Sequence, residues 1–309
     1  MRVIVVGLGI QGKKRMAVAG RDAVASVDPV ASGADYERIE DVATDSYDAA
    51  LVCTPDGPKV DLLTHLLGHG KHVLVEKPLV APGNVDLERL RALAQRTGAV
   101  CYTAYNHRFE PHLVSVKRLL EEGRIGRVYH CRMFYGNGTA RDVLNSPWRD
   151  RGLGVIPDLA SHMLDLCMFF FGPPAGEVQA WMAQRHENAA CDYFLLGYPE
   201  SSPVLMLEGT LLSWRNTFGL DVIGERGSIH VTGLCKWGPT SLTVRRRVLP
   251  SGKPDEEVHT LEQKDPTWAA EYDHFRRLCA TGGTNIDTDI WINSVLHRIG
   301  ERLGVGASA

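Results

Sequence analysis

The stretch RVIVVGLGIQG, residues 2–12, opens the chain with a short apolar run and three glycines at the spacing G-x-G-x-x-G. The run before Gly7 predicts a buried strand, and the residues after Gly12 predict a helix. In this context Gly7 allows a tight turn, Gly9 lets a pyrophosphate approach the backbone, and Gly12 lets the helix pack on the strand. The helix N-terminus would offer its N–H groups to phosphate oxygens. The stretch therefore predicts a dinucleotide site; the alternative is an ordinary strand–turn–helix unit.

A carboxylate follows the second predicted strand, residues 23–27. Asp28 comes about 20 residues after Gly7, the spacing at which an acid reaches the hydroxyls of the adenosine ribose. A carboxylate there would repel a 2′-phosphate, so the sequence favours NAD, with NADP as the other possibility. Ile10 and Gln11, between the second and third glycines, are expected to border the same cofactor.

The composition restricts the class of protein. The chain has 309 residues, of which 44% are hydrophobic and 23% charged, so its length suggests two domains. The net charge of −3 gives no general attraction to nucleic acid or an anionic membrane. No run approaches the roughly 18 apolar residues of a membrane span, and the N-terminus reads as a strand, so we expect a cytoplasmic protein. Seven cysteines without a C-x-x-C pair indicate reduced thiols.

The pattern along the chain changes near residue 107. Before it, strands and helices alternate, which predicts an α/β domain over 1–107, a Rossmann-type parallel sheet. After it, the pattern is β-rich and predicts an α+β domain over 108–309, a mostly antiparallel open-faced sheet with helices on one face. The predicted strands are 2–6, 23–27, 49–53, 72–75, 100–104, 128–135, 177–184, 193–196, 204–212, 218–223, 228–232 and 242–248. The main predicted helices are 59–67, 84–95, 111–122, 155–170, 268–280 and 289–303.

The tripeptide Glu76-Lys77-Pro78 follows the strand at 72–75, at the edge where open α/β sheets bind ligands. Here the sequence resembles the Gfo/Idh/MocA family (glucose–fructose oxidoreductase, inositol dehydrogenase, rhizopine catabolism), which carries Glu-Lys-Pro at this strand end. The resemblance implies that Lys77 binds the substrate hydroxyl and lowers its pKa, and that Glu76 and Lys77 approach the nicotinamide ribose. It also implies a proline that is often cis. For the tripeptide alone, the alternative is a surface lysine before a turn.

A second group of polar residues lies in the predicted helix 155–170. Asp158, His162 and Asp165 are four and seven residues apart, so a regular helix places them on one face. The first two match the family's Asp-x-x-x-His pattern, which implies that His162 is the catalytic acid and base and that Asp158 contacts the substrate. Asp165 is expected to accept a hydrogen bond from the imidazole or from the backbone. A divalent metal on this face is the alternative; we expect none, because hydride transfer to nicotinamide requires no metal.

The resemblance assigns further contacts, for each of which ordinary packing is the alternative. On the cofactor side they are Cys53, Thr54, Pro55 and Asn106. On the substrate side they are Arg108, Tyr135, Trp148 and Arg149.

The resemblance implies an NAD-dependent oxidoreductase that transfers a hydride between nicotinamide and a secondary hydroxyl or ketone of a sugar, nucleotide sugar or polyol. It also implies a homodimer or homotetramer. The region from Asp28 to Tyr47 is shorter than in the family, which bears on the cofactor prediction. Two alternatives stay open: a non-catalytic NAD-binding regulator, and a metal-dependent lyase or hydrolase that uses Asp158, His162 and Asp165.

Overall fold

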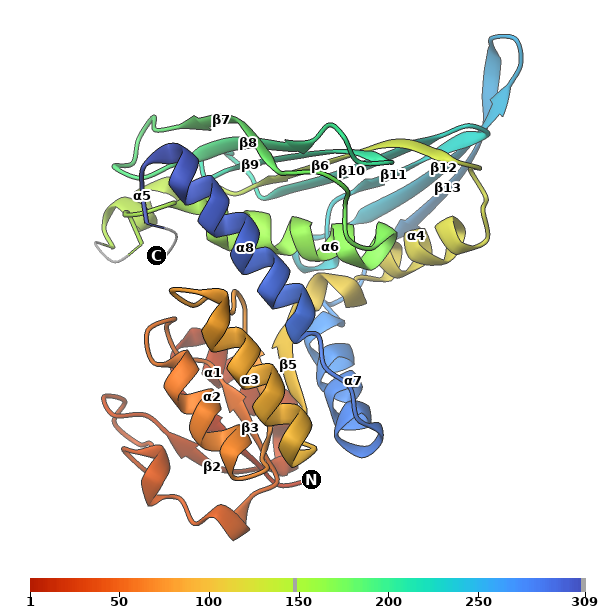
Figure 1. Ribbon diagram of the computed structural model, residues 1–309. Coiled ribbons are helices and arrows are strands. Elements are labelled where there is room, and N and C mark those ends of the chain that lie inside the picture. The colour runs from red at the N-terminus through yellow and green to blue at the C-terminus, as the bar shows by residue number, and fades with distance from the viewer. Residues whose placement is uncertain (147–148, 307–309) are drawn as a thin grey trace. The chain divides into compact units, whose positions relative to one another are not determined.

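The computed structural model describes residues 1–146 and 149–306, and the chain divides into two compact units (Figure 1). The first unit is Met1–Asn106 with Trp268–Ser294, and the second is His107–Thr267 with Val295–Ala309. The segment 268–294 therefore returns to the first unit, whereas the sequence placed it in a domain of 108–309. The reason is apolar packing: Tyr272 and Phe275 are buried in a cluster formed by the strands of the first unit.

The first unit is built on a five-stranded sheet in which every neighbouring pair is parallel. The strands lie in the order β2-β1-β3-β4-β5 and are β1 (Val3–Val6), β2 (Ala23–Val27), β3 (Ala49–Val52), β4 (His72–Glu76) and β5 (Cys101–Ala104). All residues of β1 and β3 are buried, as expected for central strands of a sheet covered on both faces. The predicted Rossmann-type parallel sheet is confirmed.

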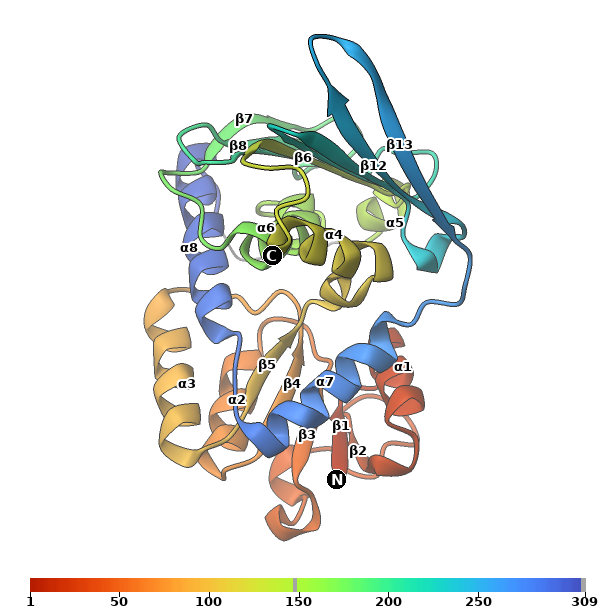
Figure 2. The same cartoon turned by 90° about the vertical axis from the view of Figure 1, so that its right-hand side faces the viewer.

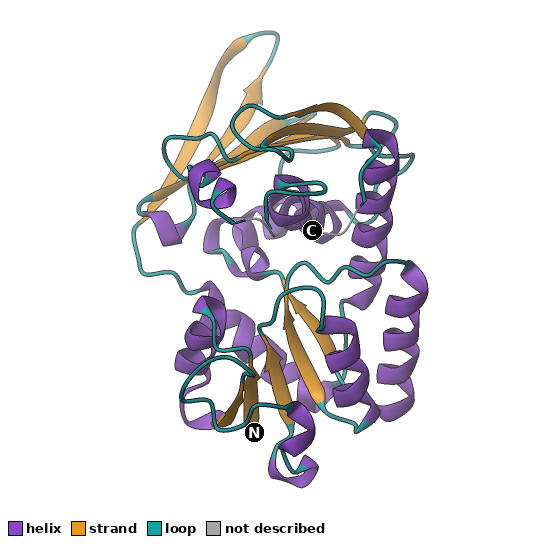
Figure 3. Cartoon of the chain, turned by 90° about the vertical axis from the view of Figure 1, so that its left-hand side faces the viewer, coloured by secondary structure: helices purple, strands orange, loops and turns teal. Residues whose placement is uncertain are grey.

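Helices cover both faces of this sheet (Figure 3). They are α1 (Ile10–Ala19), α2 (Lys59–Gly68), α3 (Asn84–Thr97) and α7 (Thr267–Thr281). Alternate strand residues point to opposite faces: Ile4 and Val6 join the cluster that contains α2 and α3, and Val3 and Val5 join the cluster under α7. Between β2 and β3, a stretch described throughout, there are only two short 3₁₀ turns and no α-helix. This side of the unit is as short as the sequence indicated.

The second unit is built on an eight-stranded sheet, seen edge-on in Figure 2. Its order is β13-β12-β11-β10-β6-β9-β8-β7, and every pair is antiparallel except β6 with β9. The strands are β6 (Val128–Gly136), β7 (Gln179–Gln184), β8 (Tyr193–Tyr198), β9 (Val204–Thr210), β10 (Thr217–Gly224), β11 (Gly227–Thr232), β12 (Thr240–Val248) and β13 (Gly252–Leu261). The mostly antiparallel sheet is confirmed.

Helices α4 (Pro111–Glu121) and α6 (Ser161–Phe171) lie on one face of this sheet (Figures 1 and 2). Buried residues alternate along β10, which fits a sheet with one covered face. A π-helical turn, Ile156–Ala160, leads directly into α6. The other helices are the short α5 (Ala140–Leu144) and the last helix, α8 (Ile286–Leu303), which has residues in both units.

Two further observations concern the chain as far as the structure describes it. None of its helices is long and apolar enough to cross a membrane. All seven cysteines lie in the described residues and none is in a disulfide; five are buried, and Cys53 and Cys279 are half-buried.

Candidate functional site

The three glycines between the end of β1 and the first turn of α1 differ in how closely other atoms pack around them. Gly7 has a φ of 92°, and a Cβ there would lie 2.8 Å from the Cys53 carbonyl oxygen. A Cβ on Gly12 would lie 1.8 Å from the Gly7 carbonyl oxygen. In contrast, a Cβ on Gly9 would meet no protein atom within 4 Å. Gly7 and Gly12 are thus required for packing, whereas Gly9 leaves space at the N-terminus of α1.

Asp28 closes the turn from the end of β2. One of its carboxylate oxygens accepts a hydrogen bond from the Leu8 N–H at 2.7 Å, and the other accepts from the Val30 and Ala31 N–H groups. The bond from Leu8, opposed by burial and aided by the other two amides, lowers the pKa of Asp28. The side chain is half-buried. An ionised, partly accessible carboxylate therefore stands beside the glycine turn.

Neighbouring groups fit a dinucleotide at this turn. The Thr54 hydroxyl is buried without a hydrogen-bond partner among the described residues, and it follows β3 beside the half-buried Cys53. Ile10 is 78% exposed and Gln11 is also exposed, so an apolar surface is available at the start of α1. The first turn of α1 contains no acidic residue that would repel a phosphate. Pro55 follows Thr54 in the same loop, and Asn106 is buried in the turn that follows β5.

The Glu-Lys-Pro segment lies at the end of β4, as the sequence predicted, and its Lys77–Pro78 peptide bond is cis. The Glu76 carboxylate accepts a hydrogen bond from Arg15 Nε at 2.7 Å. Arg15 is 1% exposed, forms a second ion pair with Glu271 at 2.6 Å, and lies over the Trp268 ring. Sequence analysis missed this group because it joins α1, β4 and α7, which are far apart in the chain. It holds the Glu76 side chain in place.

In the second unit, His162 lies in a cluster of aromatic and basic side chains. Its imidazole stacks on that of His107, with ring centroids 4.0 Å apart and planes 18° from parallel. The Tyr135 ring from β6 lies 5.5 Å from the His107 ring and 6.0 Å from the His162 ring. Lys236 donates a hydrogen bond to the Tyr135 hydroxyl at 3.0 Å and lies over the Trp237 ring at 4.5 Å. Histidine, phenol and ammonium groups are thus gathered in one place.

Asp158 belongs to the same region. Burial raises the pKa of Tyr135, and the nearby negative charge of Asp158 raises it further, so the phenol stays protonated at neutral pH. Asp158 lies in the π-helical turn rather than in the regular helix that was predicted. Such turns are frequent at functional sites. His107 and Lys236 were not among the predicted site residues: His107 lies between the predicted Asn106 and Arg108, and Lys236 lies in the glycine-flanked loop after β11.

The Asp165 carboxylate is hydrogen-bonded to Arg108, not to an imidazole or the backbone as the sequence analysis expected. It accepts hydrogen bonds from Arg108 Nε at 2.8 Å and from Nη2 at 2.6 Å. Asp165 is fully buried, which raises its pKa to about 6 even though Arg108 acts in the opposite direction. The expectation of an imidazole or backbone partner for Asp165 is therefore wrong. Arg108 was predicted to bind substrate, but two of its donors are used by this ion pair.

Of the pair Trp148 and Arg149, which was predicted to bind substrate, the structure describes Arg149. Arg149 is half-buried in the loop after α5, and its backbone N–H donates to the Ser146 carbonyl. Trp148 lies outside the described residues.

Replacing Arg108 by leucine is expected to lower the free energy of unfolding by about 3 kcal/mol or more, because it leaves a buried carboxylate without its counter-ion. Since the pKa of Asp165 is raised, its ionisation destabilises the folded state as pH rises from about 4 through about 6. Without Arg108, which lowers this pKa, the loss in the variant should be larger and should continue above pH ~6, and urea unfolding at several pH values measures it. Arg118→Leu, which breaks an exposed pair with Glu122, is the control and should change stability by about 0.5 kcal/mol or less. Equal losses in the two variants would show that the buried pair is unimportant.

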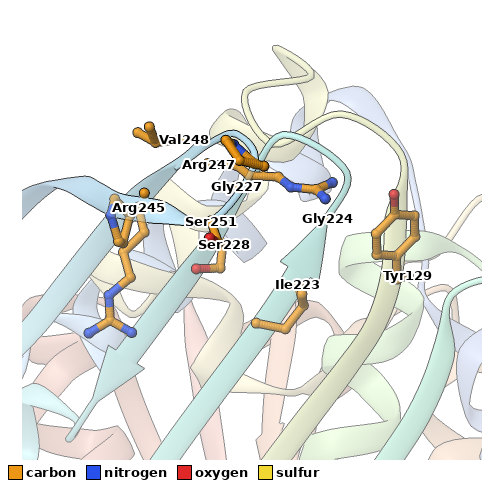
Figure 4. A pocket seen from close by; sticks show the side chains of 12 residues that line it. Tyr129, Ile223, Gly224, Gly227, Ser228, Arg245, Arg247, Val248 and Ser251 are labelled. Carbon is orange, nitrogen blue, oxygen red and sulfur yellow. The ribbon is translucent and has the colours of Figure 1, made fainter.

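A pocket of about 430 Å³ lies elsewhere in the second unit (Figure 4). Its lining includes Tyr129, Ser228, Arg245 and Arg247 from the strands, together with the turn between β12 and β13. None of the predicted site residues that the structure describes lines it. His230 Nε2 lies 2.8 Å from the Ser228 hydroxyl on the same strand, β11, and 3.2 Å from Arg245 Nη1 on the neighbouring strand, β12.

Two family models match the chain. Residues 1–105 match a model described as an oxidoreductase family with an NAD-binding Rossmann fold, and residues 113–230 match a GFO/IDH/MocA C-terminal domain. The chain belongs to the GFO/IDH/MocA family.

Proteins similar to this chain are named oxidoreductases or dehydrogenases. The uncharacterized oxidoreductase YdgJ of Escherichia coli is 31% identical over 61% of this chain and 55% of its own length. The scyllo-inositol 2-dehydrogenase (NADP(+)) IolW of Bacillus subtilis is 28% identical over 77% of this chain and 62% of its own length. The match thus spans less than two thirds of these curated relatives. The UDP-N-acetylglucosamine 3-dehydrogenase GnnA of Acidithiobacillus ferrooxidans has the same fold, with a TM-score of 0.80 at 18% identity over 99% of this chain and 98% of its own.

The structure also bears on the metal-site alternative, which used Asp158, His162 and Asp165. Within residues 1–146 and 149–306, no group of three or more His, Cys, Asp or Glu side chains is arranged to hold a metal ion. Asp165, the third ligand of the site considered from the sequence, is instead bound to Arg108.

Proposed function

We propose that this chain is an NAD-dependent oxidoreductase that transfers a hydride between nicotinamide and a secondary hydroxyl, or the matching ketone, of a sugar, nucleotide sugar or polyol. The observation that carries the proposal is the His162 cluster, in which an imidazole, a phenol, a carboxylate and an ammonium group lie together in a chain whose first 105 residues match an NAD-binding model. These groups can exchange protons with an alcohol and hold it by hydrogen bonds. The names of the inositol and UDP-sugar dehydrogenases support the same substrate class.

His162, Lys77 and Asp158 would each have a separate role in the reaction. His162 takes the proton of the substrate hydroxyl during oxidation and returns it during reduction. Lys77 donates a hydrogen bond to the same oxygen and stabilises the negative charge that develops on it. Asp158 accepts a hydrogen bond from a neighbouring hydroxyl and orients the sugar. When bound, the nicotinamide supplies the hydride acceptor or donor.

Three further residues support His162. His107 stacks against one face of its ring and fixes the plane of the imidazole. Tyr135, kept protonated by burial and by Asp158, offers a phenol O–H, and Lys236 holds that phenol by donating to its oxygen. We therefore add His107 and Lys236 to the predicted residues Tyr135 and Arg149 as groups that shape the substrate site.

The proposal includes a homodimer or homotetramer assembled through the eight-stranded sheet. Tyr129 on β6 is 41% exposed, and Trp181 and Met182 on β7 are 41% and 47% exposed. Large apolar side chains on strands of this sheet are suited to burial against a second copy.

Asp28 should make the protein prefer NADH to NADPH by at least about tenfold in Kd, because its ionised carboxylate repels a 2′-phosphate. Its pKa is lowered, so it remains charged above about pH 4, and the preference should persist from about pH 5 to about pH 8 and increase as the 2′-phosphate loses its second proton near pH ~6. Nicotinamide fluorescence titrations with both cofactors measure this and test the proposed function at the same time. Equal affinities would remove the role assigned to Asp28, and no binding of either cofactor would overturn the proposed function.

A further inference from the structure

We propose that Lys59 is a positioning residue for Lys77: it holds the backbone on both sides of the strand-end lysine in the conformation that catalysis needs. This inference rests on the proposed function, because Lys77 is assigned to the substrate hydroxyl there. All the groups involved belong to the first compact unit.

The ammonium group of Lys59 makes three short hydrogen bonds. Its Nζ donates to the Glu76 carbonyl at 2.7 Å, to the Pro78 carbonyl at 2.7 Å and to the Asp56 carboxylate at 2.7 Å. An ammonium group has three N–H donors, so these partners use all of them. The two carbonyls belong to the residues immediately before and after Lys77. The single ammonium group of Lys59 therefore holds the backbone both before and after Lys77.

The position of Lys59 is unfavourable for a positive charge. Lys59 is 1% exposed and is the first residue of α2, where the helix dipole disfavours a positive charge. Burying an ammonium group is unfavourable unless it is paired and fully hydrogen-bonded. An apolar residue could fill the space without this penalty, but it could not bind the Glu76 and Pro78 carbonyls. What Lys59 provides here is three N–H donors on one atom, which bind both carbonyls and the Asp56 carboxylate at once.

The Glu76 side chain is held independently. Arg15 binds its carboxylate at 2.7 Å and is itself bound by Glu271. Lys59 thus fixes the main chain of the segment, and Arg15 fixes the side chain of its first residue. Lys77 projects from a segment that is restrained on both sides, which is the condition for a group that must meet a substrate atom within a fraction of an ångström.

The test compares Lys59→Met with a matched control, Lys71→Met. Lys71 follows the same helix and donates to the Tyr47 carbonyl at 2.9 Å, so the control also removes a lysine that binds a main-chain carbonyl. The first measurement is hydrogen–deuterium exchange of the amides of Glu76, Lys77, Leu79 and Val80, which requires no activity. The second is kcat and KM with the best substrate found, and the third is the Kd of NADH.

Lys59→Met is expected to speed exchange in residues 76–80 and to lower kcat by about 10- to 100-fold, with the Kd of NADH changed by less than about threefold. Lys71→Met should leave both the exchange of this segment and kcat unchanged. Unchanged exchange in Lys59→Met, or faster exchange with a normal kcat, would overturn the inference. If the wild-type protein oxidises or reduces no sugar or polyol, the proposed function fails, and the exchange measurement still shows whether Lys59 holds the segment.

Discussion

Replacing His162 by alanine should lower kcat by about 10²- to 10⁴-fold, because it removes the group that takes the proton from the substrate hydroxyl. The Kd of NADH should stay within about threefold of the wild-type value, since the glycine turn and Asp28 belong to the other compact unit. Steady-state kinetics and a fluorescence titration with the same preparation provide both quantities.

The control for this variant is His112→Ala. His112 on α4 is 6% exposed and His162 is 7% exposed, so both substitutions remove a buried imidazole. His112 has no part in the cluster around Tyr135 and should be needed for stability only. If His162→Ala kept a normal kcat, or if both variants lost activity equally and only through unfolding, His162 would not be the acid and base.

The second large effect concerns Gly9 and Gly12, which should fail in different ways. Gly9→Ala should fold normally, because a Cβ there meets no protein atom within 4 Å and the φ of Gly9 is an ordinary −63°. The added methyl group would occupy the space that a pyrophosphate needs, so the Kd of NADH should rise by about 100-fold, or ~2.7 kcal/mol.

Gly12→Ala should instead be destabilised by about 3 kcal/mol or more, because its Cβ would lie 1.8 Å from the Gly7 carbonyl oxygen. Thermal unfolding without cofactor, followed by an NADH titration, separates the two effects. A Gly9→Ala variant with normal NADH affinity would show that no phosphate approaches this turn.

The sequence predicted most of the first unit because its signals are local. Each signal is contained in a few consecutive residues: a short apolar run, the glycine spacing, or an acid directly after a strand. The structure contains the strands, the glycine turn and Asp28 at the predicted places. The carboxyl ends of parallel strands must also meet at one edge, which is why Thr54 and Lys77 could be placed without coordinates.

The predictions that failed depended on distant or weak signals. The Arg108–Asp165 pair joins residues 57 positions apart, and charge alone does not say which arginine a buried aspartate binds. Strand β13 was missed because its residues are almost all exposed and polar; it is paired with β12 partly through ion pairs such as Arg245–Glu256 and Arg246–Asp255. The π-helical turn at Asp158 leaves no trace in a pattern read with 3.6-residue periodicity.

The most direct test of the proposed function is hydride transfer itself. The purified protein is incubated with NAD and a panel of polyols, free sugars and nucleotide sugars, each deuterated at one carbinol carbon, and the NADH formed is examined for deuterium by mass spectrometry. We predict that one substrate class gives deuterated NADH with the wild-type protein and about 10²-fold less with His162→Ala. If NAD binds but no substrate transfers deuterium, or if wild type and His162→Ala transfer it equally, the chain is not the dehydrogenase that we propose.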